Sequence, residues 1–207
     1  MKGPSQRAWV RLASGRRIDL LNPSPLDFED EDLAIGLSRT PRWGGHSVWE
    51  WPMSVAQHSL LVLEIAKAEH RQGLSERLQL AALLHDASEG LMAFDPISPV
   101  KPFLGDGYRF LDTRLQTIVH LRYGLPAQLP ADWTALIKNA DRAAAAAEAR
   151  HVAGWTPKEI RQALGITSRA PKTDPLVRRY GGTPWEPWPA RVAAERFCAA
   201  LAALKDR

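Results

Sequence analysis

Apolar residues recur every three to four positions along most of the chain, a period typical of helices that pack one face on a common core. Glycine and proline residues interrupt this period and mark where helices end. The expected helices span 28–38, 54–69, 75–86, 108–122, 130–153, 156–164 and 190–204. This order predicts an all-α fold class, a single helical bundle over residues 1–207, which is long enough for one well-packed domain.

Two segments depart from the helical period. Residues 8–21 alternate apolar and polar positions around Ser14-Gly15, which predicts a small N-terminal β-hairpin. An extended arm packed on the body would give the same pattern. The C-terminal irregular segment, residues 170–189 of the region 170–207, contains five prolines and two tryptophans. We expect an irregular excursion there, ordered only if its tryptophans dock.

Polar residues stand on three otherwise apolar helices. His85–Asp86 ends the apolar run LAALLHDASEG, and His58 and Asp141 lie on or beside the buried stripes of their own helices. Burying such groups costs roughly several kcal/mol unless a hydrogen-bond or charged partner satisfies them. Each has an ordinary explanation when it is taken alone. His58 would be a hydrogen-bonded core histidine, His85–Asp86 a helix cap or a buried ion pair, and Asp141 a partner of Arg142. Together, two imidazoles and two carboxylates favour one divalent transition metal (Mn, Co, Fe, Ni or Zn).

The motifs around these residues resemble a known family. The order H…HD…D resembles the HD-domain metal-dependent phosphohydrolases. HDASE followed by DPISPVK looks like the HDASE…DLPTPVK segment of the bacterial 5'-deoxynucleotidase branch, and RW ahead of SVAQHS resembles its RW…SVAEHS. These motifs lie within residues 42–141. The RW-to-His and Glu-to-Asp spacings are each one residue longer here, and RWGGHSVWEWPMSVAQHS looks closer to phage-associated and bacterial HD proteins.

The resemblance implies an HD-domain helical bundle that removes phosphate from nucleotides, most naturally (deoxy)nucleoside 5'-monophosphates. The longer spacings leave the substrate open, so a deoxynucleoside triphosphate triphosphohydrolase is the alternative within the same class. A non-catalytic nucleotide-binding module with a structural metal is the alternative of another class. A regulatory (p)ppGpp hydrolase is a third hypothesis, but no synthetase or sensor segment accompanies the domain.

Glu89 and Asp95 are the candidate proton-transfer residues. Glu89 follows Asp86 by three positions, so we expect it on the same helical face, as a general acid or base beside the metal. A surface carboxylate would also fit that position. The resemblance implies that Glu89 and Asp95 flank the phosphate or the attacking water. An aspartate before proline equally marks a turn.

Four further residues are candidate substrate contacts. Arg42 is the expected catalytic phosphate clamp, because a guanidinium binds two phosphate oxygens at once, and Trp43 would stack on the sugar or base. The resemblance favours both residues, with Arg39 as the alternative to Arg42. Lys101 would attract phosphate, or be an exposed lysine. His46 would support the site, or stabilise a turn.

The composition of the chain bears on membrane association and on the expected location. Apolar residues make up 45% and charged residues 24% of the chain, as in ordinary soluble proteins. No stretch approaches the ~20 apolar residues of a membrane span, and the N-terminus carries no secretory signal, so we expect no membrane association. The single Cys198 fits a reducing cytoplasm, our expected location.

The net charge of +4 permits steering of an anionic nucleotide substrate. Arg16–Arg17 and Arg178–Arg179 are short, separated basic pairs, which argues against binding of duplex nucleic acid. The apolar stripe of the last expected helix and several exposed-looking tryptophans favour a homodimer.

Overall fold

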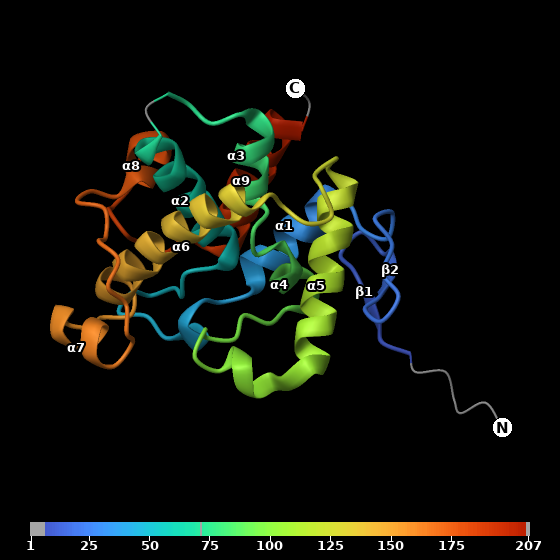
Figure 1. The fold of residues 1–207 in the computed structure, drawn as a ribbon, viewed down its shortest axis with the longest axis horizontal. Coiled ribbons are helices and arrows are strands. Elements are labelled where there is room, and N and C mark those ends of the chain that lie inside the picture. Colours follow the sequence, from blue (N-terminus) through green and yellow to red (C-terminus); the bar gives the residue numbers. More distant parts are fainter. Residues whose placement is uncertain (1–6, 71, 206–207) are drawn as a thin grey trace.

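A computed structural model describes residues 7–70 and 72–205, and it is mostly helical with one small antiparallel hairpin near the N-terminus (Figure 1). Both the all-α class and the hairpin are therefore confirmed. The helices are α1 (Asp30–Arg39), α2 (Val55–Glu69), α3 (Glu76–Leu83), α4 (Ala87–Met92), α5 (Gly105–Arg122), α6 (Ala131–His151), α7 (Pro157–Gln162), α8 (Pro175–Tyr180) and α9 (Ala190–Lys205), with 3-10 turns η1 (Trp43–Gly45) and η2 (Lys101–Leu104).

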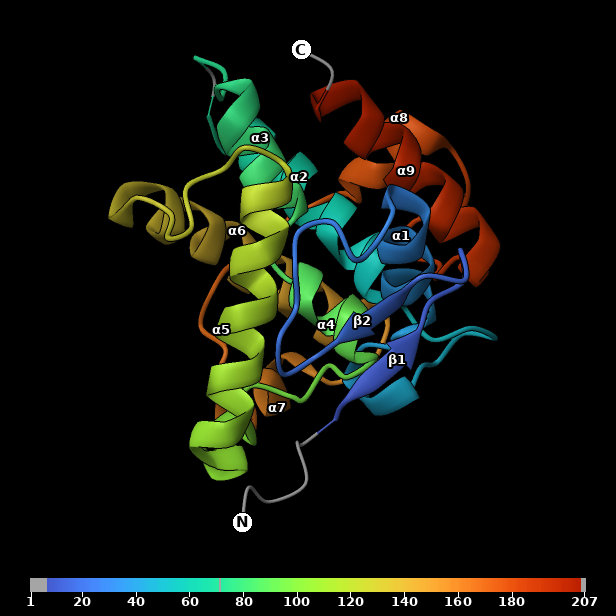
Figure 2. The ribbon, with the colours of Figure 1, turned by 90° about the vertical axis from the view of Figure 1, so that its right-hand side faces the viewer.

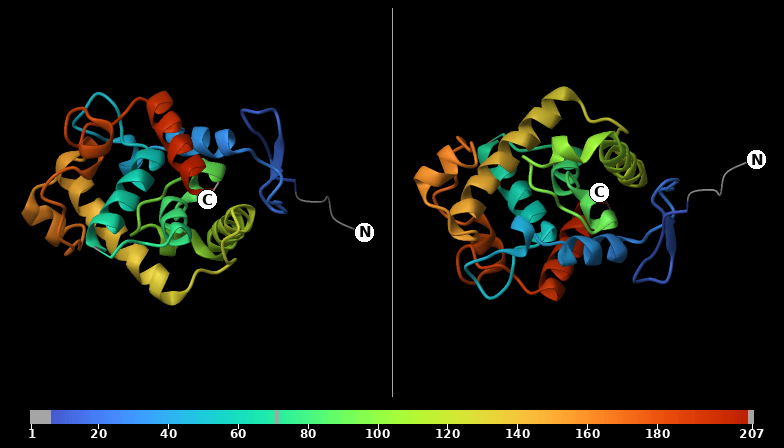
Figure 3. Two further views of the ribbon diagram at one scale, coloured as in Figure 1. Left: turned by 90° about the horizontal axis from the view of Figure 1, so that it is seen from above. Right: turned by 90° about the horizontal axis from the view of Figure 1, so that it is seen from below.

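The hairpin is attached to the helical body through its turn. Strands β1 (Trp9–Arg11) and β2 (Arg17–Asp19) pair with Val10 opposite Ile18. The backbone N–H and the hydroxyl of Ser14 both donate to the Asp32 carboxylate of α1, at 2.8 and 2.7 Å. Figure 3 shows the hairpin at one end of the molecule, beside α1. The predicted hairpin is thus anchored on the body at its turn.

Helix α2 lies at the centre of the bundle. Eleven of its fifteen residues are buried, and the helix contacts α1, α3, α6, α8 and α9. Its start is fixed by Ser54, whose hydroxyl accepts a hydrogen bond from the backbone N–H of Gln57, as expected for an N-cap. Helix α6 crosses α2 (Figure 1), so residues of the two helices face each other across the core.

Helices α1 and α4 cross at van der Waals distance between their backbones. A Cβ atom on Gly36 would meet the carbonyl carbon of Gly90 at 2.9 Å, and one on Gly90 would meet the backbone nitrogen of Leu37 at 2.8 Å. Real Cβ atoms essentially never come so close. Only glycine allows this crossing, which fixes α4 and with it Glu89, the neighbour of Gly90.

The helix expected over 75–86 is shorter in the structure. Ser75 caps it as the sequence suggests, but α3 ends at Leu83, and Asp86 is the N-cap position of α4. His85 and Asp86 therefore lie in a turn between two helices. A side chain of α5 accompanies this break in the helix. Gln116 donates to the carbonyl of Leu84 and accepts from the N–H of Ser88, two backbone groups that a continuous helix would join to each other.

The segment 170–189 is ordered and contains α8, a helix that the sequence did not predict. The ring of Trp185 stacks on that of His151 with centroids 4.8 Å apart. The Gln57 amide donates to the Glu186 carbonyl and accepts from the Trp188 N–H, at 3.0 and 2.8 Å. The ring of Trp185 therefore docks on α6, and the backbone at Glu186 and Trp188 docks on α2, next to His58, so the condition set for order is met.

Other expected boundaries shift by a few residues. Helix α1 begins at Asp30, and α5 begins at Gly105 directly after η2, three residues before the expected start. The buried face of α9 packs on α1 within the same chain (Figure 2), so its apolar stripe no longer supports a homodimer, which stays a prediction. None of the helices within 7–70 and 72–205 is long and apolar enough to cross a membrane.

Candidate metal centre

Four side chains from α2, the α3–α4 turn and α6 come together where the buried His58 meets the edge of the core. His58 is fully buried, and its Nε2 lies 3.2 Å from His85 Nε2, 3.5 Å from Asp86 Oδ2 and 3.2 Å from Asp141 Oδ1. Asp86 Oδ2 is also 3.2 Å from His85 Nε2. Ligand atoms of His58, His85 and Asp141 all lie within 4.8 Å of one another. Asp86 stands outside that tightest group, but it contacts both imidazoles.

The hydrogen bonds of the two histidines occupy their Nδ1 atoms and leave the two Nε2 atoms facing each other. His58 Nδ1 donates to the Glu148 carboxylate at 2.5 Å, and His85 Nδ1 donates to the Ala82 carbonyl at 2.9 Å. In the neutral tautomers that these partners favour, both Nε2 atoms present lone pairs to each other and to the carboxylates. Such a group of donors needs a positive charge between them.

A divalent ion fits this need. Neighbouring ligands around an ion with bonds of about 2.1 Å lie about 3 Å apart, close to the separations found here. Burial and Arg42 lower the pKa of His58, but Glu148, Asp141 and Asp86 outweigh them and raise it well above its ordinary value. The cluster draws a cation, either a proton or a metal. The His58, His85 and Asp141 group could therefore hold a metal ion.

Glu148 is a component that the sequence analysis did not identify. It lies two turns after Asp141 on α6, is fully buried, and accepts hydrogen bonds from His58, Arg42 and Trp43. Burial raises its pKa, but Arg42 and His58 hold that pKa well below the ordinary value. A carboxylate that receives the distal N–H of a ligating histidine fixes the ring and its tautomer. The sequence signal that could have identified Glu148 was a single charged residue among the buried alanines of α6.

Arg42 joins the loop before α2 to two carboxylates. Its Nε and Nη2 donate to Glu148 at 3.2 and 3.1 Å, and its Nη1 donates to Asp95 at 3.1 Å. Three of the five guanidinium N–H groups are thereby used. Trp43 adopts a positive φ of 56° beside Gly44, and its indole N–H donates to Glu148 at 3.0 Å. Arg42, Trp43 and Asp95 therefore belong to one network with His58.

Glu89 is 1% exposed, so it is not the surface carboxylate that the sequence also allowed. Its Oε1 accepts from Lys101 Nζ at 3.0 Å, which places Lys101 in the site rather than free in solvent. Among the described residues, its Oε2 has no hydrogen-bond partner. Burial, Asp86 and Asp95 raise the pKa of Glu89 to about 9, against the opposing effect of Lys101 and Arg42.

His46 is the candidate that the structure does not bring into the cluster. It is exposed, follows η1, and its backbone N–H closes that turn on the Trp43 carbonyl at 3.2 Å. This position matches the turn-stabilising alternative. Arg39, the alternative to Arg42, is the last residue of α1 and is exposed.

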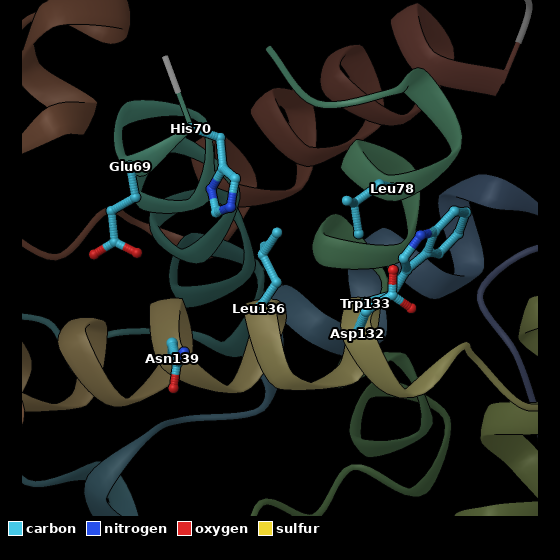
Figure 4. Close-up of a pocket in the computed structure, with 7 residues that line it drawn as sticks. All are labelled: Glu69, His70, Leu78, Asp132, Trp133, Leu136 and Asn139. Atoms are coloured by element: carbon cyan, nitrogen blue, oxygen red, sulfur yellow. The ribbon is translucent and has the colours of Figure 1, made fainter. Parts of the chain in front are cut away.

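A hollow of about 390 Å³ opens between the end of α2, α3 and the first half of α6 (Figure 4). It is lined by Glu69, His70, Leu78, Asp132, Trp133, Leu136 and Asn139. None of the four candidate metal ligands is among these residues. The hollow is therefore distinct from the place where the imidazoles and carboxylates converge.

Comparison with known proteins identifies a relative, and the name of that relative states no activity. No family model matches the chain. An uncharacterized protein of Rhodobacter capsulatus is 48% identical over 174 residues, which cover 84% of this chain and 85% of that protein.

Proposed function

The chain belongs to the same family as this Rhodobacter capsulatus protein, and we propose that it is an HD-domain, metal-dependent phosphohydrolase that acts on nucleotides. Its preferred substrates are (deoxy)nucleoside 5'-monophosphates. The ligand order His58, His85–Asp86, Asp141 and the helical fold support this assignment, together with the resemblance of the HDASE and DPISPVK segments to the bacterial 5'-deoxynucleotidase branch.

His58, His85, Asp86 and Asp141 would hold one divalent ion of the Mn, Fe, Co, Ni or Zn group, for which mixed imidazole and carboxylate ligands are suited. When bound, such an ion supplies Lewis acidity that activates water near neutral pH and offsets phosphate charge. Glu148 keeps the His58 ring in the orientation that presents Nε2, through the 2.5 Å bond at Nδ1.

Glu89 carries the argument for catalysis rather than binding. A carboxyl that is buried, held at one oxygen by Lys101 and unpartnered at the other among the described residues is costly, and a module that only binds has no use for it. Burial, Asp86 and Asp95 favour the protonated form of Glu89 in the metal-free chain, with a pKa of about 9, so a proton that Glu89 accepts in the reaction can be passed on to the leaving oxygen of the nucleoside. A cation bound nearby favours the ionised form, which suits acceptance of a proton from water.

Arg42 and Lys101 supply the positive charge for phosphate. Two N–H groups of Arg42 remain after its bonds to Glu148 and Asp95, enough for one bidentate contact. Trp43 borders the same network and offers a ring face to a sugar or base. Asp95 holds the guanidinium in place from the opposite side to Glu148.

The assignment is tested with purified protein, loaded in turn with Mn, Co, Ni and Zn and assayed for phosphate release. The panel holds nucleoside 5'-monophosphates, deoxynucleoside triphosphates and (p)ppGpp. We expect release of inorganic phosphate from monophosphates. Tripolyphosphate release from triphosphates would instead identify the triphosphohydrolase. No hydrolysis with any metal, combined with nucleotide binding, would favour the non-catalytic module.

Glu89→Gln separates catalysis from metal binding. We expect the variant to keep its metal and to lose roughly 10²-fold or more in kcat, because the amide keeps the shape of the side chain but cannot transfer the proton. Glu69→Gln, an exposed carboxylate change on α2, is the matched control. Hydrolysis by Glu89→Gln at the parent rate would show that the proton-transfer assignment is wrong.

A further inference from the structure

In the turn that carries His85 and Asp86, a side chain from another helix takes the place of a helical backbone hydrogen bond. In a continuous helix the Leu84 carbonyl would accept from the Ser88 N–H, four residues on. Here the Gln116 amide lies between those two groups. Its Nε2 donates to the Leu84 carbonyl at 2.7 Å, and its Oε1 accepts from the Ser88 N–H at 3.0 Å. One amide of α5 thus joins the two ends of the turn that carries His85 and Asp86.

The orientation of this amide is fixed by a second partner. Gln116 Nε2 also lies 2.9 Å from His120 Nε2, while His120 Nδ1 lies 3.3 Å from the Ala127 carbonyl. His120 therefore donates through Nδ1 and accepts at Nε2, so the Gln116 nitrogen has to face it. Asp112 adds a parallel contact one turn earlier, where its carboxylate accepts from the Ser88 hydroxyl at 2.6 Å.

The inserted amide holds the backbone open at the two metal-ligand positions. Asp86 has φ −111° and ψ 25°, outside the helical range. In this conformation Asp86 Oδ2 and His85 Nε2 lie 3.2 Å apart, and both reach His58 Nε2. On an unbroken helix, adjacent side chains point about 100° apart. The convergence of His85 and Asp86 therefore depends on the break.

We propose that Gln116 is a positioning residue of the metal centre, which aligns His85 and Asp86 by replacing the Leu84–Ser88 helical hydrogen bond with its own amide. Nothing in its role requires contact with metal or substrate. The proposal rests on the proposed function only in taking these residues as metal ligands, and it is independent of the substrate.

The test compares Gln116→Met with the parent protein. Methionine keeps the length of the side chain but loses the hydrogen bonds to Leu84, Ser88 and His120. We expect Co²⁺ affinity to fall about 10- to 100-fold, the usual effect of removing a group that orients a ligand. The visible absorption of bound Co²⁺ should also change, because the ligand geometry changes. Gln79→Met is the matched control, since the Gln79 side chain donates to the Leu74 carbonyl, just before α3 and away from the His85–Asp86 turn.

Gln116→Glu provides a second variant if Gln116→Met does not fold. Its carboxylate still accepts from Ser88 N–H but cannot donate to the Leu84 carbonyl, so a smaller loss of Co²⁺ affinity and an altered spectrum are expected. Parent affinity and spectrum in either folded variant, with only the melting temperature lowered, would overturn the proposal. A parent protein that binds no Co²⁺ would overturn it together with the metal centre. A parent that binds Co²⁺ but hydrolyses no nucleotide would contradict the proposed function alone.

Discussion

Glu148 binds three residues that lie 90 to 106 positions away from it in the sequence. Its carboxylate binds His58 on α2 and both Arg42 and Trp43 on the preceding loop, while Asp141 lies two turns earlier on the same helix. Loss of its charge would leave the buried Arg42 and His58 without their shared counter-ion. The arrangement of the candidate metal centre therefore depends on a residue outside the candidate ligand set.

We expect Glu148→Gln to weaken metal binding about 10- to 100-fold, because the amide no longer fixes the tautomer and orientation of His58. Calorimetric titration with Co²⁺ or Mn²⁺ measures the change. Glu195→Gln, an exposed change on α9, is the control. Unchanged metal affinity in Glu148→Gln would mean that the His58 ring is oriented by other contacts.

The sequence was informative where a polar residue interrupts an apolar stripe. His58, His85, Asp86 and Asp141 were identified in this way, and the structure brings the four together. Glu148 was missed although it also interrupts such a stripe, because its partners are 90 to 106 residues away and no local motif accompanies it. Its neighbours on α6 do not reveal those contacts.

At the scale of elements, the Gly36–Gly90 crossing determines how closely α1 and α4 approach. Gly36→Ala should destabilise the protein by about 1–3 kcal/mol, since the added methyl group meets the backbone of Gly90. Gly107→Ala is the matched control, because a Cβ there on α5 meets nothing within 4 Å. We expect it to be neutral or stabilising by up to about 1 kcal/mol.

Urea denaturation of both variants gives the free energies of unfolding. Equal stability of the Gly36 and Gly107 variants would show that α1 and α4 can separate without cost. Because α4 carries Glu89, the Gly36 variant should also lose activity at temperatures where it remains folded.

Helical periodicity predicted most elements, and Ser54 and Ser75 marked two helix starts correctly. It failed at 84–86 and at α8. At 84–86 the Gln116 side chain of α5 bonds the backbone and replaces a local pairing, and local propensity contains no information on such a partner. At α8 a local signal was overlooked, since Asp174 caps the helix by accepting from the Leu176 N–H and Pro175 follows at its first position.

For the whole molecule, His120 links stability to pH. Burial lowers its pKa below the ordinary 6.5, against the opposing hydrogen bonds of the Ala127 and Pro126 carbonyls. The unfolded chain therefore binds a proton more readily than the folded protein. The contribution of His120 is present above the unfolded pKa and is lost as pH falls through 6.5 toward the folded pKa.

We expect the free energy of unfolding of the metal-free protein to decrease between pH 7 and 5 more steeply than that of His120→Gln, which cannot take up the proton. Urea denaturation at several pH values measures the difference, and subtraction removes the titration of other groups. Parallel pH curves for the two proteins would show that His120 is protonated equally in both states.

The packing of α1 on α9 sets an order of events during translation. Lys205 pairs with Asp30, and α1, which has a buried apolar side, packs against α9. About 150 residues separate the end of α1 from the start of α9, so at roughly 5–20 residues per second a ribosome needs about 8–30 s to supply the partner. A nascent chain that already contains every candidate metal ligand therefore still exposes this apolar surface to chaperones, and the bundle closes only after α9 has been synthesised.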